Sequence, residues 1–221
     1  MKRTSVILVL ATTLGIASTK GAERAPEPDF QFRIPLHLQI PLSNGTNWYS
    51  GFGLAGWSVF TDTTAENNHA QNLLLGGISY DYGTRGSWVE LMGGSKLNRD
   101  GYNDPVADFR FLDKSLARIN LSGELAYFPR RERERFYILL AADTPLTLGK
   151  YTPRIGIESE DIFSLSGKRD SLGIGPRLVL PIPWKIHPSV SASLTTAYQF
   201  RNDRDFVRCY FGLTYKFGKK K

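Results

Sequence analysis

The last apolar segment of the chain, Asp205 to Phe217, restricts the possible folds more than any other part of the sequence. Its apolar residues occupy every second position in an unbroken row: Val207, Cys209, Phe211, Leu213, Tyr215 and Phe217. A repeat of two is the period of a β-strand. At about a dozen residues, the segment has the length of a tilted strand that crosses a bilayer. Strands of soluble sandwiches are usually about half as long.

The same alternation recurs along the chain and predicts an all-β fold. It is most regular from Phe30 to Leu42, where seven apolar residues occupy alternate positions without interruption. Pro35 and Pro41 fall between them, and because proline lacks the amide hydrogen that a sheet ladder needs, we expect a local irregularity there. We expect strands at about 30–42, 51–61, 72–83, 88–97, 118–127, 135–144, 151–162, 171–180, 188–200 and 205–217.

Ten strands of this length predict an antiparallel up-and-down transmembrane β-barrel. Counts of eight or twelve stay open because of residues 98–116, where turn signals precede Phe109 to Leu112, which could form a short strand or a segment inside the lumen. An even count would place both ends of the barrel on the same side of a membrane. The outer tips would then be 43–50, 84–87, 129–134, 163–169 and 201–205, and 181–187 would be an inner turn.

The N-terminus has the sequence of an export signal. Lys2 and Arg3 precede an apolar run that begins at Val6 and continues, more weakly, to Ala17. The alternative, an uncleaved membrane anchor, is disfavoured because the run is shorter than the roughly 18 apolar residues of a spanning helix. The expected organisation is a signal peptide at 1–22, a Pro-rich lead at 23–29, the barrel at 30–217 and a basic tail at 218–221.

The spacing of Gly212, Tyr215 and Phe217 resembles the closing strand of small, porin-like outer-membrane β-barrels of Gram-negative bacteria. In that family a glycine lies three and five residues before two aromatic or apolar positions, and the three form the assembly signal. The resemblance implies residence in the outer membrane, insertion by the barrel-assembly machinery, and contact with outer-membrane lipids that include lipopolysaccharide phosphates. The family usually ends at the final aromatic residue, whereas Gly218 to Lys221 follow here.

The polar residues at alternate positions of the expected strands would line the barrel lumen. They comprise nearly balanced bases and acids: Arg33, His37, Asp81, Glu90, Lys96, Arg118, Glu124, Arg135, Asp143, Arg154, Glu158, Glu160, Arg177, Arg208 and Lys216. In a narrow barrel such side chains meet across the lumen, and unpaired buried charges are costly. Two interpretations follow: a salt-bridged core that fills the barrel and fixes its shape, or a narrow water-filled pore lined by the same charges.

The net charge of +7 raises the question of a nucleic-acid partner. Export disfavours that partner, and an anionic membrane surface is the more natural one. Basic residues in the expected tips, such as Arg85, Arg130 and Lys168, could contact lipid phosphates or could merely keep the hairpins soluble.

The sequence contains no pattern that predicts catalysis, a metal site or a cofactor. His37, His69 and His187 are scattered, and Cys209 is the single cysteine. No phosphate-binding loop and no zinc-ligand spacing are present. We therefore expect a structural, surface-interaction or narrow-pore role and no enzyme activity. The alternatives are a lipid-modifying enzyme of the outer membrane that depends on His37, or a soluble periplasmic β-barrel that binds a ligand.

Overall fold

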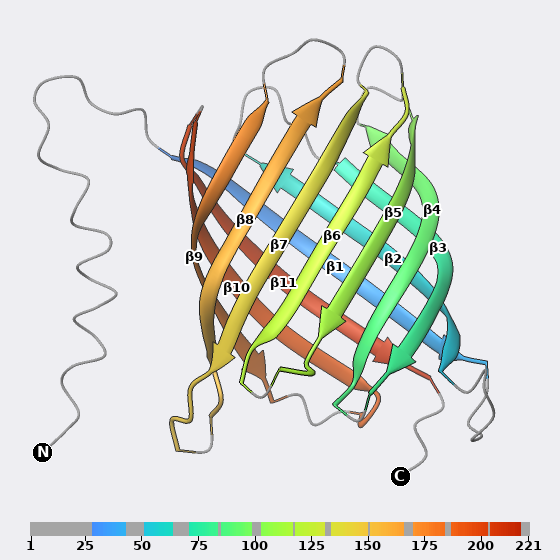
Figure 1. Cartoon of the computed structure of the whole chain (residues 1–221), viewed down its shortest axis with the longest axis vertical. Helices are drawn as coiled ribbons and strands as arrows, with labels where there is room; N and C mark the ends of the chain where they lie inside the picture. Colours follow the sequence, from blue (N-terminus) through green and yellow to red (C-terminus); the bar gives the residue numbers. More distant parts are fainter. Residues whose placement is uncertain are drawn as a thin grey trace, which may run out of the picture.

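The chain forms a single closed β-barrel in a computed structural model (Figure 1). The structure describes residues 28–42, 51–63, 71–83, 85–98, 103–116, 118–130, 134–149, 151–165, 170–183, 187–202 and 204–217. The expected signal peptide and basic tail lie outside these ranges. Among the described residues, no helix is long and apolar enough to cross a membrane.

Eleven strands make up the described part of the barrel. They are β1 Asp29–Pro41, β2 Phe52–Thr63, β3 Gln71–Tyr82, β4 Ser87–Asn98, β5 Asn103–Asp113, β6 Asn120–Phe128, β7 Arg135–Pro145, β8 Arg154–Ser164, β9 Ser171–Ile182, β10 Val190–Arg201 and β11 Phe206–Lys216. The all-β barrel expected from the sequence is confirmed, and its eleven described strands lie within the expected range of eight to twelve.

The barrel closes through a parallel pair. Successive strands pair antiparallel from β1 to β11, and β11 then pairs parallel with β1. Closure is completed by backbone bonds from Asp29 N to Asp205 O (2.9 Å) and from Phe217 N to Gln39 O (2.9 Å). A parallel closure follows from an odd strand count, because β1 and β11 then run in the same direction.

The eleventh strand is β5, and it lies in the segment whose structure the sequence left open. β5 pairs with β4 from Asn103 to Leu112 and with β6 from Ala107 to Asp113. Asp108 and Arg110 are buried, whereas Phe109 between them is exposed. Residues 98–116 therefore hold a full strand, neither a short strand nor a segment within the lumen.

The two ends of the barrel are named here by the strands that mark them. The N-rim is the end where β1 begins, at the top of Figure 1, and the C-rim is the end where β11 finishes. The expectation that both ends of the barrel lie on one side is therefore wrong. The expected outer tips also separate, because 43–50 and 84–87 connect strands at the C-rim together with 181–187, whereas 129–134, 163–169 and 201–205 connect strands at the N-rim.

The irregularity expected at the prolines is confirmed for Pro35. The parallel ladder between β1 and β11 runs from Asp29 to Arg33 and resumes at Leu36, leaving out Ile34 and Pro35. On the other side of β1, Pro35 keeps its place opposite Val59 of β2. The missing amide hydrogen therefore interrupts only the ladder that closes the barrel, and β1 continues to its end.

The outer face of the barrel is apolar. Exposed aliphatic side chains cover its middle: Leu36, Leu38, Leu54, Leu74, Ile78, Leu91, Leu125, Leu140, Ile157 and Ile174. Most exposed aromatic residues lie nearer the N-rim, at Phe30, Phe60, Phe136, Phe163 and Phe200, or nearer the C-rim, at Tyr80, Tyr151 and Phe217, while Phe109 lies in the middle. An aliphatic band between two aromatic belts is the pattern of outer-membrane barrels.

The inner face carries buried polar side chains all round the lumen, together with an apolar cluster on one side. A buried apolar cluster is formed by residues of the six successive strands β2 to β7: Ala55, Leu75, Met92, Val106, Ala126, Phe128 and Tyr137. Buried charged and amide side chains, including Glu158, Gln199 and Arg208, lie on β8, β10 and β11. Charged and amide groups are thus buried on the inner face, and many large apolar groups are exposed on the outer face, the reverse of the usual distribution in a soluble protein.

Candidate functional site

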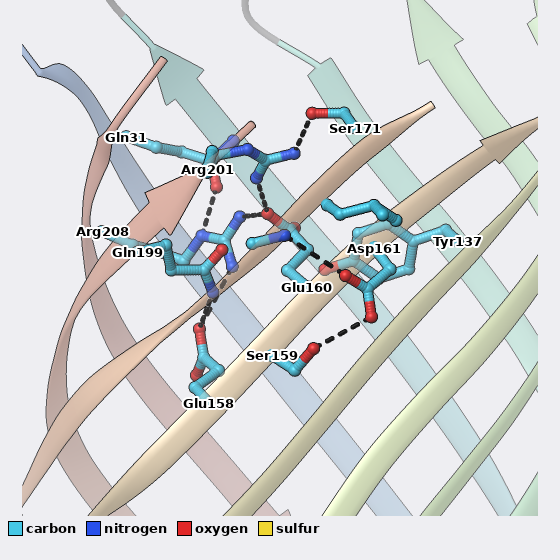
Figure 2. A network of polar contacts seen from close by, with 12 residues as sticks. Gln31, Tyr137, Glu158, Ser159, Glu160, Asp161, Ser171, Gln199, Arg201 and Arg208 are labelled. Atoms are coloured by element: carbon cyan, nitrogen blue, oxygen red, sulfur yellow. Dashed lines mark hydrogen bonds and ion pairs between the residues drawn. The ribbon is translucent and has the colours of Figure 1, made fainter. Parts of the chain in front are cut away.

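A salt-bridge network around two glutamates of β8 occupies the lumen toward the N-rim (Figure 2). Glu160 contacts three guanidinium groups: Arg33 Nη2 at 3.3 Å, Arg201 Nη1 at 2.8 Å, and Arg208, which donates from Nη2. The three guanidinium groups come from β1, β10 and β11, and Glu160 itself lies in β8. Glu160 therefore ties together strands that are not all neighbours in the barrel wall.

Glu158 accepts four hydrogen bonds one position deeper along the same face of β8. The donors are Arg177 Nη1 (2.8 Å), Gln199 Nε2 (3.0 Å), Arg208 Nη1 (3.2 Å) and the hydroxyl of Tyr210 (3.3 Å). Arg208 thus bridges both glutamates, and its Nε donates to Gln31 Oε1 at 2.8 Å. We call Glu158, Glu160, Arg33, Arg201 and Arg208 the arginine–glutamate cluster.

Burial makes the pairing in this cluster obligatory. Glu158 and Gln199 are 0% exposed, Arg208 is 1% exposed and Glu160 is 2% exposed. An ion removed from water loses several kcal/mol of hydration, which only close opposite charges and further hydrogen bonds offset. Three guanidinium groups around one carboxylate supply that compensation for Glu160, and the second carboxylate, Glu158, balances Arg208.

Two glycines of β9 make room for the cluster. Gly173 pairs with Glu160 and Gly175 with Glu158 in the antiparallel ladder. A Cβ on Gly173 would lie 2.8 Å from Arg201 Cγ and 2.9 Å from Gln199 Oε1. The glycines therefore leave open the space through which side chains of β10 reach β8. Glycine inside a strand often marks such a close approach.

A second charged group lies across the lumen on β5 and β6. Arg110 donates from Nε to Asp108 (2.9 Å) and from Nη2 to Glu124 (3.0 Å). Its guanidinium also lies 4.4 Å from the ring centroid of Trp57, a distance at which a cation is attracted to the ring face. Here one arginine binds two carboxylates, whereas at Glu160 three arginines bind one carboxylate.

A third group surrounds Glu90 of β4. His37 Nε2 lies 2.7 Å from Glu90 Oε1, Gln39 Nε2 donates to the same oxygen at 3.0 Å, and Trp57 Nε1 donates to Oε2 at 2.7 Å. His37 also stacks on Trp57, with ring centroids 4.0 Å apart. The carboxylate is enclosed by side chains from β1 and β2, so it holds those strands to β4.

Smaller ion pairs lie toward the rims. At the N-rim, Arg130 contacts Asp104 at 2.8 Å. Toward the C-rim, Asp143 contacts Arg154 at 3.5 Å and Arg177 at 3.9 Å. Lys216 of the closing strand pairs with Asp81 of β3. Charge pairing therefore runs through the length of the lumen.

Most charges expected in the lumen face it in the structure. Lys96 and Arg135, which are only partly buried, lie over the ring of Phe128, at 5.8 Å and 4.4 Å from its centroid. The exception is Arg118, which is exposed in the connection before β6. The alternation of Ile119 and Leu121 suggested that the strand begins at Arg118. In the structure, β6 begins at Asn120.

Sequence reasoning missed several members of these groups. Asp104, Asp108 and Arg110 belong to β5, which was not recognised as a full strand. Arg201 was placed in a tip, yet it is the last residue of β10 and turns inward to Glu160. The alternation of Asp108 and Arg110 with Phe109 and Phe111 was the available signal for β5.

The assembly-signal residues are placed at the closing seam. Gly212 lies in β11, where an added Cβ would be 3.3 Å from Ser193 Oγ and 3.7 Å from Pro35 Cγ. The rings of Tyr215 and Phe217 meet edge to face at the C-rim, with centroids 4.5 Å apart. Their role in assembly stays a prediction.

Taken together, the groups place paired charges and aromatic rings along the lumen. Glu90, Asp108, Glu158 and Glu160 are each held by two or more donors, an arrangement that fixes strands in place. No protein-family model, curated protein or solved structure matches this chain.

Proposed function

We propose that the chain is an integral β-barrel of a bacterial outer membrane whose lumen is closed by its own side chains. The observation that carries the proposal is the reversed distribution of polarity, with Arg208 and Glu158 buried while Leu91 and Leu74 are exposed. A barrel in water would leave a broad apolar band unsolvated, whereas a bilayer solvates it.

The rival proposal of a soluble periplasmic ligand-binding barrel requires the opposite arrangement. Such a barrel would carry an apolar cavity inside and polar side chains outside. Here the side chains of His37, Gln199 and Arg208 occupy the inside, and aliphatic residues form the outside. Export by the N-terminal signal and residence in the outer membrane are therefore part of the proposal.

Within the membrane, the packed lumen favours a structural or surface-interaction role over a pore. Ions crossing the barrel would have to pass Arg208 and Glu160, both fully buried and bonded to each other. Across the lumen, Arg110 is held between Asp108 and Glu124. Opening a water-filled path would break several of these pairs at once, at a cost of several kcal/mol each.

Planar-bilayer recording tests this closure. The purified, refolded protein is expected to give no discrete conductance steps, because the arginine–glutamate cluster and the Glu90 group block the lumen. A general porin added to the same bilayer serves as the positive control. Regular unitary steps from the wild-type protein would contradict the closed lumen and favour the narrow pore.

A lipid-modifying enzyme is the less favoured alternative. It would place catalytic groups on the outer face, where lipid substrates lie. His37, the residue on which that alternative depends, is 5% exposed and lies among Glu90, Trp57 and Trp88 on the inner face. We therefore propose no catalytic activity; loss of lipid modification in His37→Ala by thin-layer chromatography would overturn this.

The closing strand is proposed to direct assembly. Phe217→Ala is expected to lower the amount of inserted barrel in cells several-fold, while the free energy of unfolding falls by only about 1 kcal/mol, the edge contact with Tyr215. The physical reason is that the assembly machinery recognises an unpaired strand before the ring is packed. The measurement compares heat-modifiable protein per cell with refolding yield in detergent.

Deleting Lys219 to Lys221 is the control for this variant. Removing the basic tail is expected to leave insertion unchanged or to improve it, since the resembling strands end at the aromatic residue. Normal insertion of Phe217→Ala, or failure of insertion after the deletion, would show that Gly212, Tyr215 and Phe217 do not form an assembly signal.

A further inference from the structure

The two rims of the barrel differ in charge once the strand topology assigns each connecting segment to its end. The five segments that join strands at the C-rim are 42–51, 83–86, 114–119, 146–153 and 183–189. In sequence they contain Arg85, Lys114, Arg118, Lys150 and Lys185 and no Asp or Glu. The N-rim segments, by contrast, mix basic residues such as Arg131 and Lys168 with acidic ones such as Glu132 and Asp170.

Three of the C-rim cations line one small pocket. Arg85 comes from the turn between β3 and β4, and Lys114 and Arg118 come from the connection between β5 and β6. Leu116, Asn120 and Pro145 complete the lining. Its volume is about 230 Å³, below the roughly 300–1,000 Å³ of pockets that enclose drug-sized ligands. The pocket therefore suits a small anionic group.

Local hydrogen bonds hold the pocket in shape. Arg85 Nη1 donates to the carbonyl oxygens of Ser115 (3.5 Å) and Leu116 (3.4 Å), which places the guanidinium beside the β5–β6 connection. A guanidinium carries five N–H donors, and these bonds use only Nη1. The carboxylate nearest in sequence to Lys114 is that of Asp113, which accepts a hydrogen bond from the backbone N–H of Ser115 at 2.6 Å.

The pocket also borders apolar surface. Leu116, within the lining, is 51% exposed, and Ile119 in the same connection is 44% exposed. Asn120 marks the first residue of β6, so the pocket lies where the strands leave the apolar band. A phosphate joined to acyl chains presents the same combination, an anionic head beside an apolar body.

We infer that the pocket of Arg85, Lys114 and Arg118 binds the phosphate of an anionic phospholipid headgroup. Guanidinium groups match phosphate geometry through paired N–H donors, and the lysine adds a point charge. The inference rests on the proposed membrane location and adds to it a defined lipid site on one rim. Bound lipid would anchor the β5–β6 connection to the membrane surface.

The test uses the full chain folded in neutral detergent, with folding checked by its heat-dependent mobility on gels. Phosphatidylglycerol or phosphatidylcholine is titrated in, and bound lipid is counted by native mass spectrometry. The Arg85→Gln/Arg118→Gln variant is expected to bind phosphatidylglycerol about 25-fold more weakly, since each basic residue near an anionic surface contributes about 1 kcal/mol. Binding of phosphatidylcholine is expected to stay unchanged.

Matched variants isolate the pocket. Arg118→Gln alone, which leaves the bonds of Arg85 intact, is expected to weaken phosphatidylglycerol binding about five-fold. Lys168→Gln/Arg169→Gln, which removes two charges from an N-rim segment, is expected to have no effect. Equal binding by wild type and the Arg85→Gln/Arg118→Gln variant, or an equal loss in the N-rim control, would overturn the site.

Two further outcomes separate this inference from its premises. Inorganic phosphate is expected neither to bind at matched concentration nor to displace phosphatidylglycerol; displacement would show that a soluble phosphate is the ligand and overturn the lipid assignment. Because lipid binding is measured on folded protein in detergent, failure to insert into vesicles would count against the proposed membrane location alone.

Discussion

Replacing Glu160 with glutamine is expected to lower the free energy of unfolding by about 3–5 kcal/mol, the cost of leaving buried charges without their partner. Glu160 contacts Arg33, Arg201 and Arg208, and the substitution keeps its shape while removing its charge. In this variant Arg208 would keep its ion pair with Glu158. Urea titration of the protein refolded into vesicles gives the measurement.

Asp161 supplies the matched control on the same strand. It follows Glu160 directly but lies on the other parity, where it accepts bonds from Ser159 Oγ (2.9 Å) and Gly173 N (3.2 Å). Asp161→Asn is expected to change the free energy of unfolding by less than about 1 kcal/mol. Equal stability of Glu160→Gln and wild type would show that the arginine–glutamate cluster does not hold the barrel together.

The double variant Glu160→Leu/Arg208→Met separates charge pairing from packing. An ion pair replaced by apolar residues of similar volume is often neutral in stability. The double variant is therefore expected to be more stable than Glu160→Gln, although Arg33 and Arg201 keep it below wild type. A double variant that is no more stable than the single one would point to shape, not charge, as the function of the pair.

Replacing Leu91 with arginine is expected to cost about 2–4 kcal/mol in a bilayer, the cost of a basic residue at the midplane of the lipid face. Leu91 is 59% exposed and pairs with Ile78 and Phe109 in the middle of the aliphatic band. The same urea titration in vesicles measures the loss.

Leu97 provides the depth control. It lies on the same face of β4 as Leu91 but near the N-rim, and it pairs with Asn72 and Asn103. Leu97→Arg is expected to cost only about 0–1 kcal/mol, because an arginine near the interface reaches water. Equal tolerance at the two positions would show that no hydrocarbon layer surrounds β4, and the soluble barrel would then gain support.

The alternation of apolar residues was enough to predict the closed barrel and most of its strands, because each strand has one face turned out and one turned in. It failed at β5 for a physical reason. The outer positions near the start of β5 are Pro105 and Ala107, which lack the bulky side chains that mark the outer row elsewhere. The first apolar aromatic residue appears only at Phe109, so half of the strand looked like a loop.

One missed strand changed the expected topology of the whole chain. With ten strands, the tips at 84–87 and 129–134 would share a side; with eleven, they lie at opposite rims. The uneven charge of the two rims, and hence the pocket of Arg85 and Arg118, could not be seen before the strand count was known.

Parity predicted which charges face inward but not which charges meet. Glu160 and Arg208 are 48 residues apart and lie on strands that are not neighbours in the sheet. Such contacts depend on the register of every strand between them, and on small residues such as Gly173 that leave space. Arg201 illustrates the limit, since a residue at a strand end can turn either to solvent or to the lumen.

The reversed polarity of the barrel is tested most directly by refolding the urea-denatured protein with and without lipid vesicles. With vesicles, we expect protein that floats with the lipid, resists added protease and migrates faster on gels before heating than after. Without lipid or detergent, we expect aggregation, because the aliphatic band around Leu74, Leu91 and Leu140 is left in water. A protease-resistant, monomeric barrel that forms in buffer alone and stays out of the lipid would contradict the membrane location.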